Sequence, residues 1–421
     1  MSTTSQRIES VEALQLSLHG HKVGVIVHYS GGKNILTFDP EYAALPEETR
    51  PVITLTQRLD QHYLNRALLN SQRVPPVISN LLPEGTLREW MATKLKTHSA
   101  NEFPLLAWTG NNLPGAIVAA PLFKGETPAW ALSSREQVEP VQVNIRNTPQ
   151  RFSLAGVQMK FSTIRQDGRY NVSADVEGDS WIIKTPSTLH RNVPENEYSA
   201  MRLAEAIGVN IPDITLVDLN TLDNLPDIPL PNESMAYAIR RFDRGQQGRI
   251  HTEDFAQIFE LYPHDKYSKK NYEQIAAVLY RYGSDGLEDV QQIARRLLAN
   301  ILLANGDAHL KNWTIIYPDT INARLAPAYD IVSTLPYVEG ETSIALNLAK
   351  QKNWRLMNFT SFQVWSERID VPWPAVKVHI TDALNRARDS WPQLLEGLPM
   401  REAHKDVLRK HWSMLSEDFR F

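Results

Sequence analysis

Cysteine is absent from all 421 residues of the chain. Disulfide bonds, thiolate metal sites and a cysteine nucleophile are therefore excluded, which fits a protein of a reducing compartment. Long hydrophobic runs are also missing, since no apolar stretch reaches the roughly 18 residues that a membrane-spanning helix needs. The polar start, MSTTSQRIES, lacks the apolar core of an export signal. We therefore expect a cytoplasmic protein that does not contact a membrane.

A strong charge of either sign is missing too. The chain has 44 basic and 48 acidic side chains, a net charge of −4 and a pI of about 6.3. No overall positive field attracts nucleic acid or an anionic membrane, so we do not expect this chain to bind DNA directly by itself. Its composition, 42% hydrophobic and 22% charged, is ordinary for a globular protein, and its length predicts two or three domains.

The order of the predicted elements indicates a β-rich part followed by a helical part. Alternating apolar residues predict strands within 14–38, whereas 54–98 is expected to be mainly helical around the motif NLLPEG (80–85). Residues 115–122 read as a buried strand. A polar stretch with prolines follows, then short strands, a helix in PENEYSAMRLAEAIG and two more strands. After residue 245, helical spacing dominates.

An α+β fold with four segments follows from this order. We expect a mixed α/β N-terminal domain at 1–125, a linker at 126–150, a β-rich lobe at 151–245 and a helical lobe at 246–421.

The segment NGDAHLKN (305–312) carries the main chemical signal. It lies between the apolar run RRLLANILLA and the strand-like run WTIIY. Asp307 and Asn312 are five residues apart, and Asp330 follows in APAYDIV. Phosphoryl transfer needs one aspartate to take or orient the proton of the attacking hydroxyl, then an asparagine and a second aspartate to hold magnesium. The spacing D-x-x-x-x-N is that of protein-kinase catalytic loops.

Two other readings of this segment stay open. A polar loop is usually only solvated, and the spacing occurs by chance in many chains. Asp307, His309 and Asp330 together would alternatively suit a hydrolytic metal site. That site lacks convincing supporting ligands, and Lys311 would lie unfavourably beside a dication. Lys311 instead suits neutralisation of charge on a transferring phosphoryl group.

The upstream half supplies residues that a kinase small lobe needs. WIIKTPS places Lys184 at the end of an apolar strand, and the following helix carries Glu195 and Glu197 near its start. A lysine that contacts phosphates and a helix glutamate that orients it have this order in kinases. The general alternative is a strand-end lysine that reaches water. The preceding SLAGVQMKFS has one glycine, so it is neither a Walker loop nor G-x-G-x-x-G.

Six segments in this order resemble one known family. SLAGVQMKFS, IIKTPS, ENEY, RRFDR, NGDAHLKN and APAYDIVSTLP are similar to the HipA family of bacterial serine/threonine kinases, the toxins of HipA–HipB toxin–antitoxin modules. NLLPEG and FPLLAWTGNNLPGAIVAAP are similar to the family's N-terminal part. The resemblance implies a two-lobed, protein-kinase-like fold with ATP and Mg²⁺ between the lobes.

Site residues follow from the resemblance by position. It implies that Asp307 is the catalytic base, that Asn312 and Asp330 hold Mg²⁺, and that Lys184 contacts phosphates. We favour Glu197 over Glu195 as the partner of Lys184. Further nucleotide-site positions are the loop residues Ser153, Gly156, Gln158 and Lys160, the hinge residues Arg240, Arg241 and Phe242, and His309. His309 alternatively acts as a turn residue that donates to the backbone.

One position departs from the family pattern. The usual acidic hinge residue is replaced by Arg240. Adenine is read at this hinge mainly through backbone groups, so we expect ATP binding to survive. Ser153 matches the serine that relatives autophosphorylate. A phosphate there adds roughly −1.5 to −2 charge beside the ATP phosphates and is expected to act as an off-switch.

Partners are likewise implied by the family. Relatives phosphorylate aminoacyl-tRNA synthetases, pair with a small helix-turn-helix antitoxin, HipB, and reach operator DNA through it. Two alternatives remain. A small-molecule phosphotransferase of the antibiotic type would be expected to have an acidic pocket for a cationic substrate. The basic segment RRFDRGQQGR near the hinge argues against such a pocket. A catalytically silent, corepressor-like binding module would not need Lys184, Asp307, Asn312 and Asp330 together.

Overall fold

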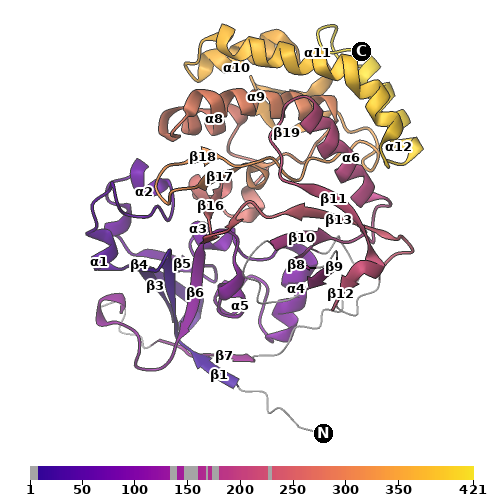
Figure 1. Cartoon of the computed structure of the whole chain (residues 1–421). Helices are drawn as coiled ribbons and strands as arrows, with labels where there is room; N and C mark the ends of the chain where they lie inside the picture. Colours follow the sequence, from indigo (N-terminus) through magenta and orange to yellow (C-terminus); the bar gives the residue numbers. More distant parts are fainter. Residues whose placement is uncertain (1–7, 133–139, 147–159, 167–168, 173–179, 226–229) are drawn as a thin grey trace.

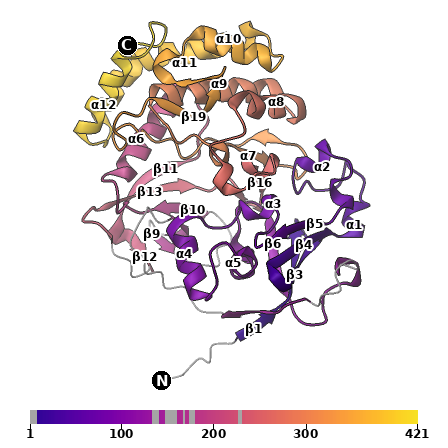
Figure 2. The ribbon, with the colours of Figure 1, turned by 180° about the vertical axis from the view of Figure 1, so that it is seen from behind.

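The computed structural model describes residues 8–132, 140–146, 160–166, 169–172, 180–225 and 230–421. An N-terminal domain in indigo and purple lies beside a central sheet, and helices from the second half cover the opposite side (Figure 1). The view from behind shows the same three layers, with α3 next to β16 where the N-terminal domain meets the rest (Figure 2). Within the described ranges, no helix has the combined length and apolar character that crossing a membrane demands.

The N-terminal domain is built on an antiparallel sheet of order β5-β4-β3-β2-β6. Its strands are β2 (Ala13–Leu18), β3 (His21–Tyr29), β4 (Lys33–Phe38), β5 (Leu68–Ser71) and β6 (Ile117–Leu122). Its helices are α1 (Pro40–Ala43), α2 (Thr56–Leu59), α3 (Pro76–Ser79), α4 (Gly85–Lys94) and α5 (Glu102–Thr109). The strands expected within 14–38 and at 115–122 are confirmed.

The segment 54–98 differs from its expected helical character. Its helices are short, and β5 inside it pairs with β4 as an edge strand. Leu68 and Asn70 are partly covered, whereas Leu69 and Ser71 are exposed, so this strand has the two-residue alternation of an edge. The strand has only four residues, so its alternation was not recognised within a segment that otherwise shows helical spacing.

The predicted linker 126–150 is packed in its described part. β1 (Ile8–Val11) pairs antiparallel with β7 (Val143–Arg146). Ala131 is buried in a cluster with Tyr29 and Val27. This stretch thus adds to the N-terminal domain, and the expected domain limits remain predictions.

The next lobe holds a sheet of order β11-β13-β10-β8-β9-β12. Its strands are β8 (Lys160–Gln166), β9 (Arg169–Val172), β10 (Ser180–Lys184), β11 (Ile214–Asp218), β12 (Leu222–Asp223) and β13 (Met235–Arg240). One helix, α6 (Val193–Ala206), packs against β11 and β13. Pro194 lies in its first turn and Gly208, with φ of +84°, follows its end, as the sequence predicted.

The last lobe is mainly helical. It contains α7 (Phe255–Ile258), α8 (Tyr272–Tyr282), α9 (Gly286–Leu302), α10 (Phe359–Arg368), α11 (Trp373–Gly397) and α12 (Glu402–Ser413). Its strands are β14 (Arg244–Gly245), β15 (Gly248–Arg249), β16 (His251–Asp254), β17 (Thr314–Tyr317), β18 (Arg324–Leu325), β19 (Ser343–Leu348) and β20 (Gln351–Asn353). The expected α+β architecture, with a β-rich lobe, a helical lobe and an extra N-terminal domain, is thus confirmed.

A buried polar contact joins the N-terminal domain to the helical lobe. The Glu253 carboxylate accepts hydrogen bonds from the Thr54 hydroxyl (2.8 Å), the Leu55 amide (2.6 Å) and the Tyr317 hydroxyl. All three donors satisfy a carboxylate that has no exposed surface. The interface between the N-terminal domain and the helical lobe therefore depends on directed hydrogen bonds as well as on apolar packing.

Candidate active site

Lys184, at the end of β10, lies between two carboxylates. Its ammonium contacts Glu197 of α6 on one side and Asp330 on the other. The Lys184 and Glu197 side chains are only 5% and 4% exposed. Lys160 pairs with Lys184 across β8 and β10, and its Nζ lies 3.2 Å from Asp330 Oδ2. Two strands, one helix and a loop from the other lobe therefore converge on one charge cluster.

The charges of this cluster support one another. Burial alone would lower the pKa of Lys184, but the Asp330 and Glu197 carboxylates raise it above its ordinary value. Burial alone would raise the pKa of Asp330, but the Lys160 and Lys184 ammonium groups hold it well below its usual range. Lys184 and Asp330 are therefore charged at neutral pH.

The loop that follows α9 is shaped by its own side chains. The Asp307 amide donates to Asn305 Oδ1 (3.0 Å), and the Asn305 amide group donates to Asn300 Oδ1 (2.9 Å). Asn312 Nδ2 donates to the Asp307 carbonyl (2.8 Å). The Asp307 carboxylate remains 46% exposed, and the Tyr267 hydroxyl donates to it. The five-residue spacing between Asp307 and Asn312 thus closes a compact turn that leaves the Asp307 carboxylate accessible.

Asn312 and Asp330 line the same small cavity, together with Asn305 and Tyr329. Their amide and carboxylate oxygens are of the kind that Mg²⁺ prefers, so the donor set fits this ion. Asp330 reaches the site with a φ of +54°, a left-handed conformation that aspartate tolerates better than most residues. Within the described ranges no group of three His, Cys, Asp or Glu side chains is arranged to hold a metal.

The hinge segment is anchored to the N-terminal domain. Arg241 Nε donates to Asp243 Oδ1 (2.8 Å), and the Gly115 amide donates to Asp243 Oδ2 (2.8 Å). Arg244 donates to the Gly115 carbonyl (3.0 Å). These contacts hold the segment after β13 close to the loop that precedes β6.

The two other residues expected at the hinge, Arg240 and Phe242, have contacts different from those of Arg241. The Arg240 side chain is 42% exposed and pairs with Asp213 at 3.3 Å. The Phe242 ring packs against Tyr329, with 5.7 Å between the ring centroids. Phe242 therefore links the hinge to the residue that precedes Asp330.

His309 is buried beside Asp307. Burial lowers its pKa to about 4, which leaves the ring neutral near pH 7. Its Nε2 lies 4.0 Å from Asp307 Oδ1, and its ring meets Tyr267 edge-on. Its Nδ1 has no hydrogen-bond partner among the described residues, so the expected donation to the backbone is not found at this atom.

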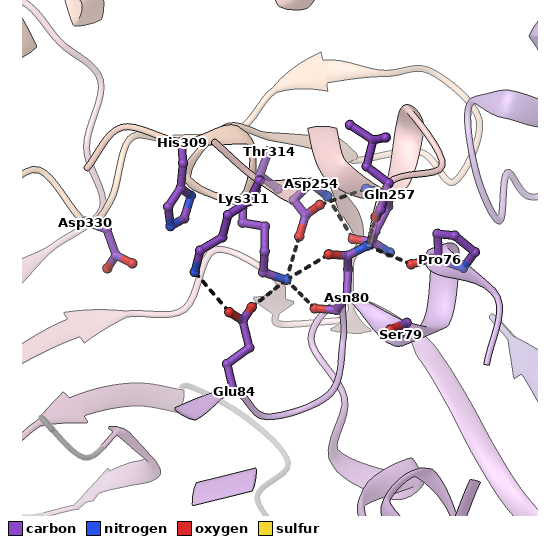
Figure 3. A network of polar contacts seen from close by, with 12 residues as sticks. Pro76, Ser79, Asn80, Glu84, Asp254, Gln257, His309, Lys311, Thr314 and Asp330 are labelled. Carbon is purple, nitrogen blue, oxygen red and sulfur yellow. Dashed lines mark hydrogen bonds and ion pairs between the residues drawn. The ribbon is translucent and has the colours of Figure 1, made fainter. Parts of the chain in front are cut away.

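Lys311 has a different environment from the one that the sequence predicted. Its ammonium contacts the Asn80 carbonyl (2.6 Å), Glu84 Oε1 (3.2 Å) and Asp254 Oδ2 (3.2 Å), and the side chain is 13% exposed (Figure 3). The Lys311 ammonium, which we expected to face a phosphoryl group, is thus already paired with these three residues. The structure instead makes Lys311 a link to the N-terminal domain.

Three expected site residues, Ser153, Gly156 and Gln158, lie outside the described residues. Sequence reasoning missed the side chains from other segments that surround the loop 305–312, namely Asn80, Glu84, Asp254, Lys266 and Tyr267. NLLPEG offered a signal for Asn80 and Glu84, because a conspicuous polar motif interrupted an apolar segment. Tyr267 and Asp254 carry no such signal, since only the folded chain brings them near the loop.

Comparisons with known proteins agree with this architecture. The family model described as the HipA-like C-terminal domain matches residues 152–391, and that of the HipA N-terminal domain matches residues 14–120. Y4dM of Sinorhizobium fredii, which is named as a kinase, is 36% identical over 413 residues, covering 95% of this chain and 96% of the relative. The serine/threonine-protein kinase toxin HipA of Shewanella oneidensis is 23% identical over 306 residues, 66% of each chain.

Among solved structures, a chain from the complex of Shewanella oneidensis HipA, HipB and operator DNA is similar. The TM-score is 0.68 at 19% identity, and the match covers 95% of both chains. The two family models together cover both the N-terminal domain and the two lobes. The chain therefore belongs to the HipA family.

Proposed function

We propose that this chain is an ATP- and Mg²⁺-dependent protein serine/threonine kinase. One observation carries the proposal: the Lys184 ammonium lies between Glu197 and Asp330, and Asp330 shares a cavity with Asn312. These are the parts that phosphoryl transfer requires from a small lobe and a large lobe. Relatives that are named as kinases, including a HipA toxin, support it.

The residues have separate roles in the proposed reaction. Lys184 and Lys160 provide positive charge for the ATP phosphates, and Glu197 keeps Lys184 in place. Asn312 and Asp330 would hold Mg²⁺, which when bound supplies charge neutralisation at the phosphates. The Asp307 carboxylate, which is partly exposed, accepts or orients the proton of the acceptor hydroxyl. His309 is neutral and buried next to Asp307, so it shapes this acceptor without adding positive charge.

The acceptor and the partners are the finer part of the proposal. We infer a HipA-like toxin that phosphorylates a protein serine or threonine, with an aminoacyl-tRNA synthetase as the expected target, in the cytoplasm. A HipB-like helix-turn-helix antitoxin would bind it and bring operator DNA indirectly. The similar solved chain belongs to a complex with HipB and operator DNA, which supports this choice. Autophosphorylation of Ser153 would lower ATP affinity by repulsion.

The first experiment is ATP turnover by the purified chain with Mg²⁺, followed by mass spectrometry of the chain, with Asp307→Asn as the control. Phosphate on Ser153 in the wild type and none in the variant is expected. ATP binding without any phosphorylated residue would point to a small-molecule phosphotransferase or a silent binding module. Equal ATP affinities of Ser153→Ala and Ser153→Asp would contradict the off-switch.

A further inference from the structure

The side chain of Lys311 joins the catalytic loop to the N-terminal domain. Its Nζ contacts two oxygens of Asn80, the carbonyl at 2.6 Å and Oδ1 at 3.3 Å, and one of Glu84 at 3.2 Å. Asp254, at the end of β16, completes the set at 3.2 Å. Lys311 lies between Leu310 and Asn312 in one 3-10 turn, so fixing its ammonium also restrains the backbone that carries Asn312.

Glu84 also contacts the segment that precedes Tyr267, the residue that donates to Asp307. Its second oxygen, Oε2, contacts Lys266 Nζ at 3.0 Å. The Lys266 carbonyl accepts a hydrogen bond from the Leu310 amide (3.1 Å). Tyr267, the next residue, donates to Asp307. A single carboxylate of the N-terminal domain therefore pairs with Lys266 and with Lys311, on two separate segments of the helical lobe.

The other partners of Lys311 are themselves held firmly. Asn80 Nδ2 donates to the carbonyl of Leu261 (2.7 Å) in the helical lobe and to that of Pro76 (2.9 Å). Asp254 caps α7 by accepting from the Gln257 amide (2.9 Å). Asn80 and Asp254 are therefore held in place by contacts that do not involve Lys311.

Charge balance makes Glu84 hard to replace. Lys311 and Lys266 face the two carboxylates Glu84 and Asp254, so the cluster is neutral. Without Glu84, Lys311 keeps Asp254 as a carboxylate partner, whereas Lys266 loses the carboxylate that lies 3.0 Å from its Nζ. An uncompensated charge there favours rearrangement of the segments that carry it.

We propose that Asn80 and Glu84 are positioning residues of the phosphoryl-transfer site, which hold the loop Asp307–Asn312 through Lys311 and Lys266. The inference rests on the proposed kinase function. It assigns NLLPEG a role in placing the catalytic loop, so that the N-terminal domain is part of the working site. Other contacts, such as Thr56 Oγ1 to the Ile258 carbonyl (3.1 Å), attach the domain without touching this loop.

The test compares Glu84→Gln with Thr56→Val, a matched control that removes one interdomain hydrogen bond elsewhere. Because a small displacement of reacting groups costs up to about 100-fold, we expect Glu84→Gln to lower kcat at least about tenfold. The KM for ATP should change less than kcat, since Lys184 and the hinge lie outside the altered contacts. Thr56→Val should leave kcat unchanged, although it also removes a contact between the two domains.

Hydrogen exchange of the full-length protein separates positioning from activity. Faster exchange at residues 307–312 in Glu84→Gln, with wild-type exchange there in Thr56→Val, is expected. Lys266→Met, which breaks the other half of the bridge, should show the same change and serves if Glu84→Gln does not fold. Equal exchange of this loop in all four proteins would overturn the proposal. Absence of phosphate transfer by the wild type would refute the kinase function alone, because the exchange result stands independently.

Discussion

The Lys184 ammonium contacts the Glu197 carboxylate, and the two side chains are among the most enclosed charges of the chain. Glu195, two residues earlier on α6, is half-buried and has one oxygen without a hydrogen-bond partner among the described residues. The sequence placed both glutamates near the start of the same helix. The helical rotation of about 200° between them turns Glu197 toward β10 and Glu195 away from it.

Replacement of Glu197 by glutamine should therefore impair phosphoryl transfer. The neutral amide no longer holds Lys184 by charge, and we expect kcat/KM for ATP to fall at least about tenfold, or about 1.4 kcal/mol. Steady-state turnover measures this. Glu195→Gln is the matched control on the same helix and should stay within about threefold. Equal losses in the two variants would contradict the assignment.

Asp330 contacts two lysines, so a metal must compete with them. Mg²⁺ alone is expected to raise the unfolding temperature little, because binding would release Lys160 and Lys184 from their shared partner. Mg²⁺ with ATP should raise it by several degrees, since the phosphates replace Asp330 at both ammonium groups. Thermal shift assays measure both effects.

The control for this prediction is Asp389→Asn on the exposed side of α11. Asp330→Asn should lose most of the joint stabilisation, whereas Asp389→Asn should retain it. A full shift with Mg²⁺ and no nucleotide would show that Asp330 binds the metal without release of its lysines.

Much of the fold was predictable because its elements carry strong local patterns. Alternation predicted the strands within 14–38, and helical spacing predicted α6, α8, α9 and α11. Pro194 and Gly208 marked the two ends of α6 correctly. The edge strand β5 and the strand pair β1–β7 were missed, because short segments take their pairing from distant neighbours.

The site was predictable where residues lie close in sequence to a motif. Asn312 and Asp330 line one cavity, and Asp307 lies on the same loop as Asn312. Lys184 contacts Glu197 on the helix that follows it. The environment of Lys311 was not predictable. Its partners lie 57 and more residues away, so only the docking of two domains brings them together.

Tyr267 donates to the Asp307 carboxylate from a side chain that is 45% exposed. Burial and the Asp307 charge raise the pKa of Tyr267 above its usual range, so it remains a donor at neutral pH. An acceptor hydroxyl must contact the same carboxylate, so it has to displace the Tyr267 hydroxyl. Tyr267→Phe should therefore increase ATP hydrolysis without protein acceptor by up to about tenfold, the strength of one hydrogen bond to a charged group.

Tyr282→Phe, at the exposed end of α8, is the control and should leave hydrolysis unchanged. The measurement compares ATP hydrolysis with Mg²⁺ by the wild type, Tyr267→Phe and Tyr282→Phe. A loss of hydrolysis in Tyr267→Phe would mean that the tyrosine orients the base instead of competing for it.

Glu253 makes interdomain stability depend on pH. Burial raises its pKa from 4.5 to about 7, despite hydrogen bonds from Tyr317, Thr54 and Leu55 that act in the other direction. The folded state therefore binds more protons than the unfolded state between these values, so stability falls as pH rises through that range. The loss by pH 8 is about 3 kcal/mol relative to pH 4.5.

Glu253→Gln isolates this contribution because glutamine does not titrate. The free energy of unfolding of the wild type should decline relative to the variant between pH 5 and 8, as measured in denaturant at each pH. Buried histidines act with the opposite sign, since His251 and His411 have pKa values of about 4 and destabilise the fold as pH falls below 6.5. Both histidines are present in the wild type and in Glu253→Gln, so their contributions cancel in the difference between the two free energies of unfolding. A difference that stays constant with pH would show that the three donors keep the carboxylate ionised in the folded protein, and the domain interface would then be insensitive to pH at this residue.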